Sequence, residues 1–184
     1  MGLLILLGVV VLVALWGVSI YNGLVRRKNM VAEGWSGIDV QLKRRADLIP
    51  NLVETVKGYA AHESSTFENL ARLRSQAQAQ TDVAQRAQTE ASITAAIGRV
   101  LAVAEAYPQL RASENFQSLQ KDLAEVEDQI QLARRYYNGA VRDFNVMIEQ
   151  FPSNLVAGWG GFKPAAFFQA DDADRAVPKV SFAT

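Results

Sequence analysis

The amino-acid sequence predicts an all-α protein in which an N-terminal transmembrane helix is followed by an antiparallel four-helix bundle with long helices. Three observations support this class: an uncharged apolar run near the N-terminus, long stretches with apolar residues every three or four positions, and no strand-like alternation. Amphipathic helices that each carry one apolar face must bury those faces against one another, which produces a helical bundle.

The apolar run extends from Leu3 to Ile20 and contains no charged residue and no proline. A membrane-spanning helix needs about 20 mostly apolar residues, a length reached when residues 21–25 are included. Trp16 and Tyr21 fit the preference of amphipathic rings for the lipid headgroups. We therefore expect residues 1–25 to form a membrane anchor that contacts the bilayer through residues 3–20. A removable signal peptide is the alternative, but a basic leading region and a small-residue cleavage pattern are missing.

Arg26, Arg27 and Lys28 follow the apolar run directly, whereas only the α-amino group precedes it. Basic residues that flank a span favour the cytoplasmic side. The sequence therefore predicts an N-terminus outside the cell and a bundle in the cytoplasm.

The bundle is expected over residues 26–152. Its first helix continues from the anchor to about Gly58, with Gly23 as a natural hinge and Pro50 as a kink. Further helices are predicted over 63–79, 83–107 and 113–150, with Thr81-Asp82 as a capping point and with Pro108 and Pro152 as stops.

Residues 153–168 are rich in glycine and aromatic residues. Their rings are expected to cover one end of the bundle, insert at the bilayer surface or dock on another subunit; they are Trp159, Phe162, Phe167 and Phe168. Residues 169–184 are predicted to be a flexible polar tail.

Composition argues against most catalytic chemistry. The 184 residues include no cysteine and one histidine, which excludes thiolate metal sites, disulfides and a histidine-rich metal centre. His62-Glu63 lacks the second histidine of a zinc-protease helix, because Thr66 stands one turn later. Nineteen basic residues balance nineteen acidic ones, so the chain lacks the charge of a nucleic-acid binder. We predict no catalytic residue, metal or cofactor.

Polar residues beside the apolar stripes form the remaining candidate site. Three roles are open for the arginines at positions 44, 45, 134 and 135. They would pair with Asp39, Asp47 and Asp143 in a structural network, or they would form an interface with a partner or a second copy. If they lie near the membrane, they would contact anionic lipid. The full set is Asp39, Arg44, Arg45, Asp47, Asn51, Arg134, Arg135, Tyr137, Asn138 and Asp143.

Five blocks of this sequence resemble the LemA family of single-pass bacterial membrane proteins. They are YNGLVRRKNMVAEGWSGID (21–39), IDVQLKRRADLIPNLVETVKGYAAHE (38–63), LAVAEAYPQLRASENF (101–116), ENFQSLQKDLAEVEDQIQLARRYYNGAVRDFN (114–145) and FPSNLVAGWGGFKP (151–164). The resemblance implies a four-helix bundle behind a membrane helix, a place at the bacterial inner membrane and no established catalytic activity. It also implies a role in shaping internal membranes or an association with membrane proteases.

The sequence is therefore interpreted as a non-enzymatic, membrane-anchored scaffold that forms a homo-oligomer through its bundle. An adaptor that presents substrates to a membrane protease is the second hypothesis. A hydrolase with an unrecognised site is the third.

Overall fold

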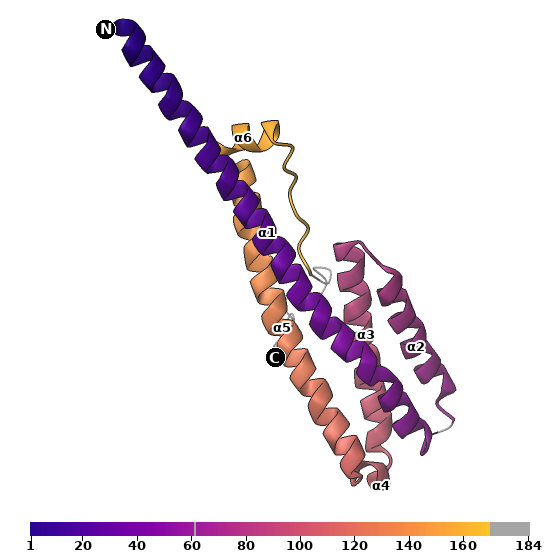
Figure 1. Ribbon diagram of the computed structural model, residues 1–184. Helices are drawn as coiled ribbons and strands as arrows, with labels where there is room; N and C mark the ends of the chain where they lie inside the picture. Colours follow the sequence, from indigo (N-terminus) through magenta and orange to yellow (C-terminus); the bar gives the residue numbers. More distant parts are fainter. Residues whose placement is uncertain (61, 170–184) are drawn as a thin grey trace, which may run out of the picture. The chain divides into compact units, whose positions relative to one another are not determined.

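The computed structural model describes residues 1–60 and 62–169, and all regular structure within these ranges is helical (Figure 1). The elements are α1 (Gly2–Lys57), α2 (Ser64–Ala79), α3 (Val83–Glu105), α4 (Pro108–Arg111), α5 (Glu114–Glu149) and α6 (Ser153–Trp159). The all-helical prediction is confirmed for this part of the chain. Apart from Gln169, the predicted polar tail lies outside the described residues.

Helix α1 is a single helix of 56 residues that continues through both Gly23 and Pro50. Among the described residues, it is the one helix long and apolar enough to cross a membrane, and its apolar window is fully exposed. A proline at position 50 cannot donate to the carbonyl of residue 46. The Arg74 Nε donates to that Ala46 oxygen at 2.7 Å. A side chain from α2 therefore satisfies the acceptor that the proline leaves open.

The boundaries of α2 and α3 follow local signals. Helix α2 begins at Ser64, one residue after the predicted start, and ends at Ala79 as predicted. The side chain of Asp82 accepts a hydrogen bond from the Gln85 backbone nitrogen at 2.8 Å, which confirms the predicted cap of α3. Helix α3 ends at Glu105, and Pro108 opens the short α4, where the sequence predicts only a link between two helices.

Helix α5 begins at Glu114 and ends at Glu149, one residue from each predicted limit. The Phe151–Pro152 peptide bond after it is cis, and α6 starts at Ser153. The glycine–aromatic segment, to which the sequence analysis assigns no secondary structure, thus contains a helix of seven residues.

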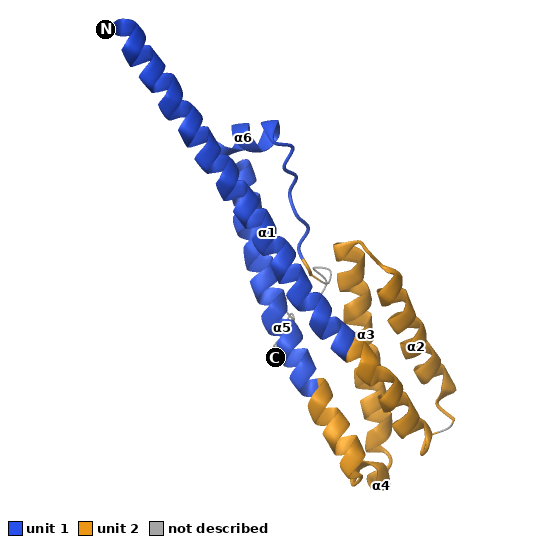
Figure 2. Ribbon diagram, in the orientation of Figure 1, with its two compact units in different colours: residues 1–44, 124–167 blue, residues 45–123, 168–184 orange. Residues whose placement is uncertain are grey.

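The chain divides into two compact units (Figure 2). Unit 1 comprises residues 1–44 and 124–167, and unit 2 comprises residues 45–123 together with the chain from 168 onward. Helices α1 and α5 each contribute to both units. The predicted domain limits of 1–25, 26–152 and 153–168 remain predictions.

In unit 1, the first part of α1 packs against the last part of α5. Arg44 pairs with Glu125 at 3.3 Å, and the rings of Trp35 and Tyr137 are 5.8 Å apart. A Cβ atom on Gly34 would lie 3.1 Å from the Tyr137 Cα. The missing side chain at Gly34 therefore allows the two backbones to approach closely.

Unit 2 has an apolar core of its own, and α2 and α3 are neighbours in it. Side chains from successive helices fill this core, among them Leu52, Val56, Leu70, Ile93 and Val100. These positions follow the three-to-four spacing on which the helix predictions rest.

Candidate functional site

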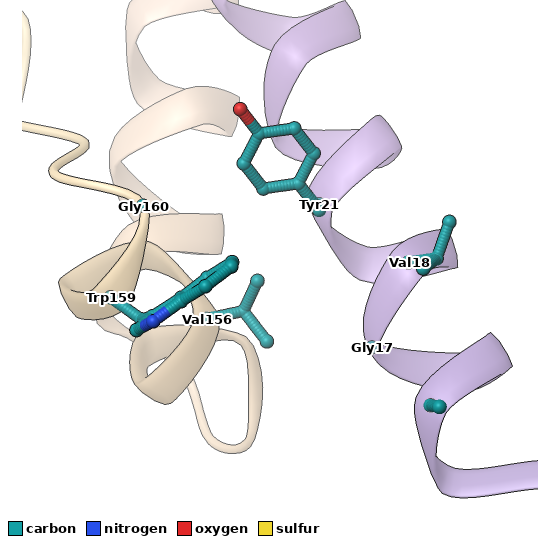
Figure 3. A pocket seen from close by; sticks show the side chains of 7 residues that line it. Gly17, Val18, Tyr21, Val156, Trp159 and Gly160 are labelled. Carbon is teal, nitrogen blue, oxygen red and sulfur yellow. The ribbon is translucent and has the colours of Figure 1, made fainter. Parts of the chain in front are cut away.

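A groove of about 640 Å³ separates the apolar part of α1 from α6 within unit 1 (Figure 3). Its α1 wall consists of Ala14, Gly17, Val18 and Tyr21, and its α6 wall of Val156, Trp159 and Gly160. No lining residue carries a charge. The groove can therefore accept an apolar group, and the polar side-chain groups among its lining residues are the Tyr21 hydroxyl and the Trp159 indole nitrogen.

Helix α6 is fixed at its start by a serine. The Ser153 hydroxyl is buried and lies 2.7 Å from the Met147 carbonyl and 3.0 Å from the Gln150 carbonyl, which accept its hydrogen bond. One turn later, Ala157 is buried with Leu24 and Phe144. The α6 face that packs on α1 and α5 therefore consists of small side chains.

An aromatic cluster closes the junction between α1, α5 and the chain after α6. The Phe162 ring lies 5.5 Å from the Tyr21 ring and 6.3 Å from the Phe144 ring, both edge-on. A Cβ atom on Gly160 would come within 2.7 Å of Phe162, and Gly161 has a φ of +67°. Glycine at these two positions is what allows the chain to turn back and seat Phe162.

Side chains of α5 hold the segment after Phe162 in place. Asn145 donates to the Ala165 oxygen at 3.0 Å and accepts from the Ala165 nitrogen at 2.8 Å. The Tyr137 hydroxyl donates to the Ala166 oxygen at 2.8 Å. Burial raises the pKa of Tyr137 above its usual value of 10.0, because the phenolate would lose solvation.

The predicted aromatic contacts differ in exposure. Trp159 is 87% exposed and Phe167 is 39% exposed, whereas Phe162 is half-buried and Phe168 is buried. The structure adds two exposed apolar residues that the sequence analysis did not select, Phe151 and Leu155. Leu155 lies four residues before Trp159, and Phe151 four residues before Leu155, and this spacing is the signal that could have identified them.

A second cavity of about 450 Å³ also lies in unit 1. Trp35, Tyr137 and Phe162 contribute aromatic walls, and Lys28 and Lys163 line it as well. The side chains that line it are thus mainly aromatic and aliphatic, with two cationic groups.

The predicted polar residues are divided between the units. Arg45 is 2% exposed and pairs with Glu90 at 2.7 Å within unit 2, and it also donates to Thr94 at 2.7 Å. Arg86 donates to the other Glu90 oxygen at 3.2 Å. Glu90 was not among the predicted partners, although it lies three residues before Ile93 on the apolar face of α3.

The other charged candidates lie nearer to the surface. Arg44 pairs with Glu125, and Asp143 pairs with Arg27 at 3.5 Å and with Arg142 at 3.3 Å. Asp39, Arg134 and Asn138 are half-buried, whereas Asp47, Asn51 and Arg135 are exposed. The described residues contain no group of three or more histidine, aspartate or glutamate side chains that could hold a metal. His62 is exposed.

The LemA family model matches residues 34–182, well over half of the chain. The chain belongs to the LemA family. The match covers most of α1 after the apolar run and all of α2 to α6. The α6 wall of the groove therefore lies inside the LemA match, and its α1 wall lies before it.

Among curated proteins, the LemA chain is 27% identical to "Magnetosome protein MamQ 2" of Paramagnetospirillum magneticum, over 81% of this chain and 64% of that protein. It is 27% identical to "Protein LemA" of Metamycoplasma hominis, over 84% of this chain and 71% of that protein. "Magnetosome protein MamQ" of Magnetospirillum gryphiswaldense is 24% identical, over 87% of this chain and 70% of that protein. The chain thus spans less than two thirds of the first of these relatives.

Proposed function

We propose that this LemA-family protein is a non-enzymatic membrane scaffold, anchored in the bacterial inner membrane by residues 3–20 and assembled as a homo-oligomer through its helices. One observation carries the proposal: an exposed apolar stretch, Leu3 to Val18, continues without a break into the packed part of α1. Such a stretch is costly in water and favourable in lipid. The likeness to magnetosome proteins and to a LemA protein supports a membrane role.

The fold that we propose for the scaffold is an antiparallel four-helix bundle of α1, α2, α3 and α5. Within unit 1, increasing residue numbers in α1 pair with decreasing numbers in α5: Arg27 with Asp143, Trp35 with Tyr137 and Arg44 with Glu125. This order supports an antiparallel pair. A disulfide formed between cysteines introduced at Arg44 and Glu125 would test it, with Arg44 and Asp143 as the mismatched pair.

Self-association is supported by an exposed stripe on α5. Leu132, Tyr136 and Val146 are each about half exposed, and at 100° per residue they fall within an arc of about 80°. Anchoring all copies in one membrane with the same orientation raises their effective concentration. Weak lateral contacts therefore suffice for assembly.

Native mass spectrometry of the full chain in nanodiscs tests the scaffold. We expect oligomers for the unaltered chain and a shift towards monomer for Leu132→Glu with Val146→Glu. Exchange of two exposed polar residues on another face of α5, Gln120→Glu with Gln131→Glu, is the charge-matched control. A strict monomer at every protein-to-lipid ratio would refute self-association.

The orientation that we propose places the N-terminus outside and the bundle in the cytoplasm, as Arg26, Arg27 and Lys28 favour. A reporter fused after Thr184 distinguishes the two sides of the membrane. Cytoplasmic activity supports the orientation, and periplasmic activity reverses it without affecting the anchor.

The second candidate function is an adaptor for a membrane protease. The apolar groove beside Trp159 favours it, because such a groove could receive an apolar segment of another protein. Stoichiometric co-purification with a protease, lost in Val156→Asp, would support the adaptor in place of the scaffold.

A further inference from the structure

The outer face of α6 is apolar and open. Phe151, Leu155 and Trp159 are spaced four residues apart and are 78%, 65% and 87% exposed. On the opposite side of the helix, Ser153 and Ala157 are buried. The element thus directs its large apolar side chains outward and its small ones inward, the reverse of a helix that covers the core of a protein in water.

The whole segment around this face is uncharged. No charged residue occurs between Glu149 and Lys163. Single exposed apolar residues are ordinary. Here Leu155 and Trp159 lie on successive turns of α6 and Phe151 stands two residues before the helix, so three large exposed apolar side chains occur within nine residues of an uncharged segment, as is typical of a surface that contacts another.

The position of α6 identifies that surface. Gly17 and Val18, on the apolar run of α1, form the groove wall opposite Val156 and Trp159 (Figure 3). Tyr21, at the end of the same run, contacts Phe162 just after α6. The exposed face of α6 therefore continues the exposed apolar surface of the anchor.

We propose that Phe151 and α6 form a second membrane contact, which lies in the interfacial layer of the bilayer beside the point where α1 leaves the lipid. Interfacial helices bury their apolar face about 5–10 Å below the headgroup boundary. Tryptophan and tyrosine favour this layer, and Tyr21 and Trp159 supply them on the two walls of the groove. The inference rests on the proposed function, since residues 3–20 must first lie in lipid.

Spin labelling of single-cysteine variants tests this contact, because the chain contains no cysteine of its own. Leu155→Cys reports on α6, Leu12→Cys on the anchor and Val40→Cys on an exposed apolar site of unit 1. Val40 lies 20 residues beyond Ile20, about 30 Å along α1. The full chain is reconstituted in nanodiscs of phosphatidylethanolamine and phosphatidylglycerol, and relaxation by oxygen and by an aqueous nickel complex gives the depth of each label.

We expect the label at 155 to lie within about 10 Å of the headgroup boundary on the lipid side, the label at 12 deeper, and the label at 40 in water. A label at 155 that matches the one at 40, while the label at 12 is in lipid, overturns the second contact alone. A label at 12 in water refutes the anchor and hence the proposed function. Spin–spin broadening at 155 that vanishes on dilution with unlabelled chain assigns the face to a second copy and also overturns the proposal.

An unlabelled variant guards against disturbance by the nitroxide. Trp16→Phe with Trp35→Phe leaves Trp159 as the sole tryptophan. We expect its emission to be shifted to shorter wavelength and quenched by lipids brominated near the headgroup. Emission typical of water, quenched by aqueous iodide and unaffected by brominated lipid, would overturn the proposal. The triple variant that adds Trp159→Phe provides the background.

Discussion

Arg74 and Pro50 should be energetically coupled through one carbonyl oxygen. In α1 the Ala46 oxygen cannot receive the amide hydrogen that residue 50 would normally supply, and Arg74 Nε donates to it instead at 2.7 Å. Replacing Arg74 by methionine keeps an unbranched chain as far as the Nε position but removes the donor. We therefore expect Arg74→Met to lower the free energy of unfolding only as long as residue 50 is proline.

The magnitude follows from the kind of bond that is lost. A hydrogen bond from a charged donor contributes about 1.5–3 kcal/mol, and because Arg74 is only half-buried we expect about 1.5 kcal/mol. Pro50→Ala should stabilise α1 by about 2 kcal/mol, since interior proline costs about 3 kcal/mol and its stiffening of the unfolded chain returns about 1 kcal/mol. In that background the backbone nitrogen of residue 50 donates to the Ala46 oxygen, so Arg74→Met should cost about 0.5 kcal/mol or less.

Urea unfolding of the full chain in detergent micelles is followed by circular dichroism at the helical band. It gives the free energy of unfolding of the unaltered chain, of Arg74→Met, of Pro50→Ala and of the double variant, which together form a double-mutant cycle. Arg72→Met is the matched control, because Arg72 bonds only to side chains of its own helix in the contacts described. The coupling energy should be about 1 kcal/mol. If Arg74→Met costs the same with proline and with alanine at position 50, the proposed capping of Ala46 is wrong.

Three further predictions concern packing and charge. Glu90→Ala should lower the free energy of unfolding by about 3–5 kcal/mol, because it leaves the Arg45 charge buried without this partner. Glu125→Ala removes one member of an exposed pair and should cost less than about 1 kcal/mol. Equal losses of the two variants in urea unfolding would contradict this prediction. Gly34→Ala should destabilise the chain by about 1 kcal/mol, because the added Cβ meets the α5 backbone. Gly37→Ala has open space around its Cβ and should stabilise the chain by up to about 1 kcal/mol. Thermal unfolding that ranks the two variants in the reverse order would refute the close approach of α1 and α5. Burial raises the pKa of Tyr137, so its contribution to stability is complete below pH 10.0 and is lost as pH rises through the higher pKa of the folded state; Tyr137→Phe should flatten this alkaline loss, and an unchanged slope would assign the loss to other groups.

The helices that could be predicted from the sequence are those with strong local signals. Asp82 marks the start of α3 through its own hydrogen bond, and Glu114 and Pro152 bracket α5. Such signals act within one turn of the chain, so they can be read from neighbouring letters. Helix α4 was missed because Pro108 was interpreted as a stop, although proline is equally suited to the first turn of a new helix.

Other features depend on residues far apart in the sequence. Gly23 was interpreted as a hinge, but the helix continues through it, and a Cβ there would meet the Met147 side chain at 2.7 Å. Glycine lowers helix propensity wherever it stands, and only the partner helix reveals that the small size is required for packing. The same reason hides Glu90 from a search for partners of Arg45, since 45 residues separate them.

The candidate contact on α6 was visible in part. Trp159 could be selected from the sequence as an aromatic residue in a glycine-rich segment. Leu155 and Phe151 could be placed beside it only once residues 153–159 were known to be helical. The groove with Gly17 and Val18 depends on the return of the chain from α5 to α1, which no local pattern encodes.

Because α1 is unbroken, a tilt of its apolar run is transmitted to the part of the same helix that packs in unit 1. The 24 residues from Tyr21 to Arg44 extend about 36 Å beyond the apolar run. A thinner or thicker membrane changes the tilt of a helix of fixed apolar length, and a tilt of about 10° would swing the far end of this arm sideways by about 6 Å. In the proposed homo-oligomer, the thickness of the surrounding lipid would thereby set how closely the helices of adjacent copies approach.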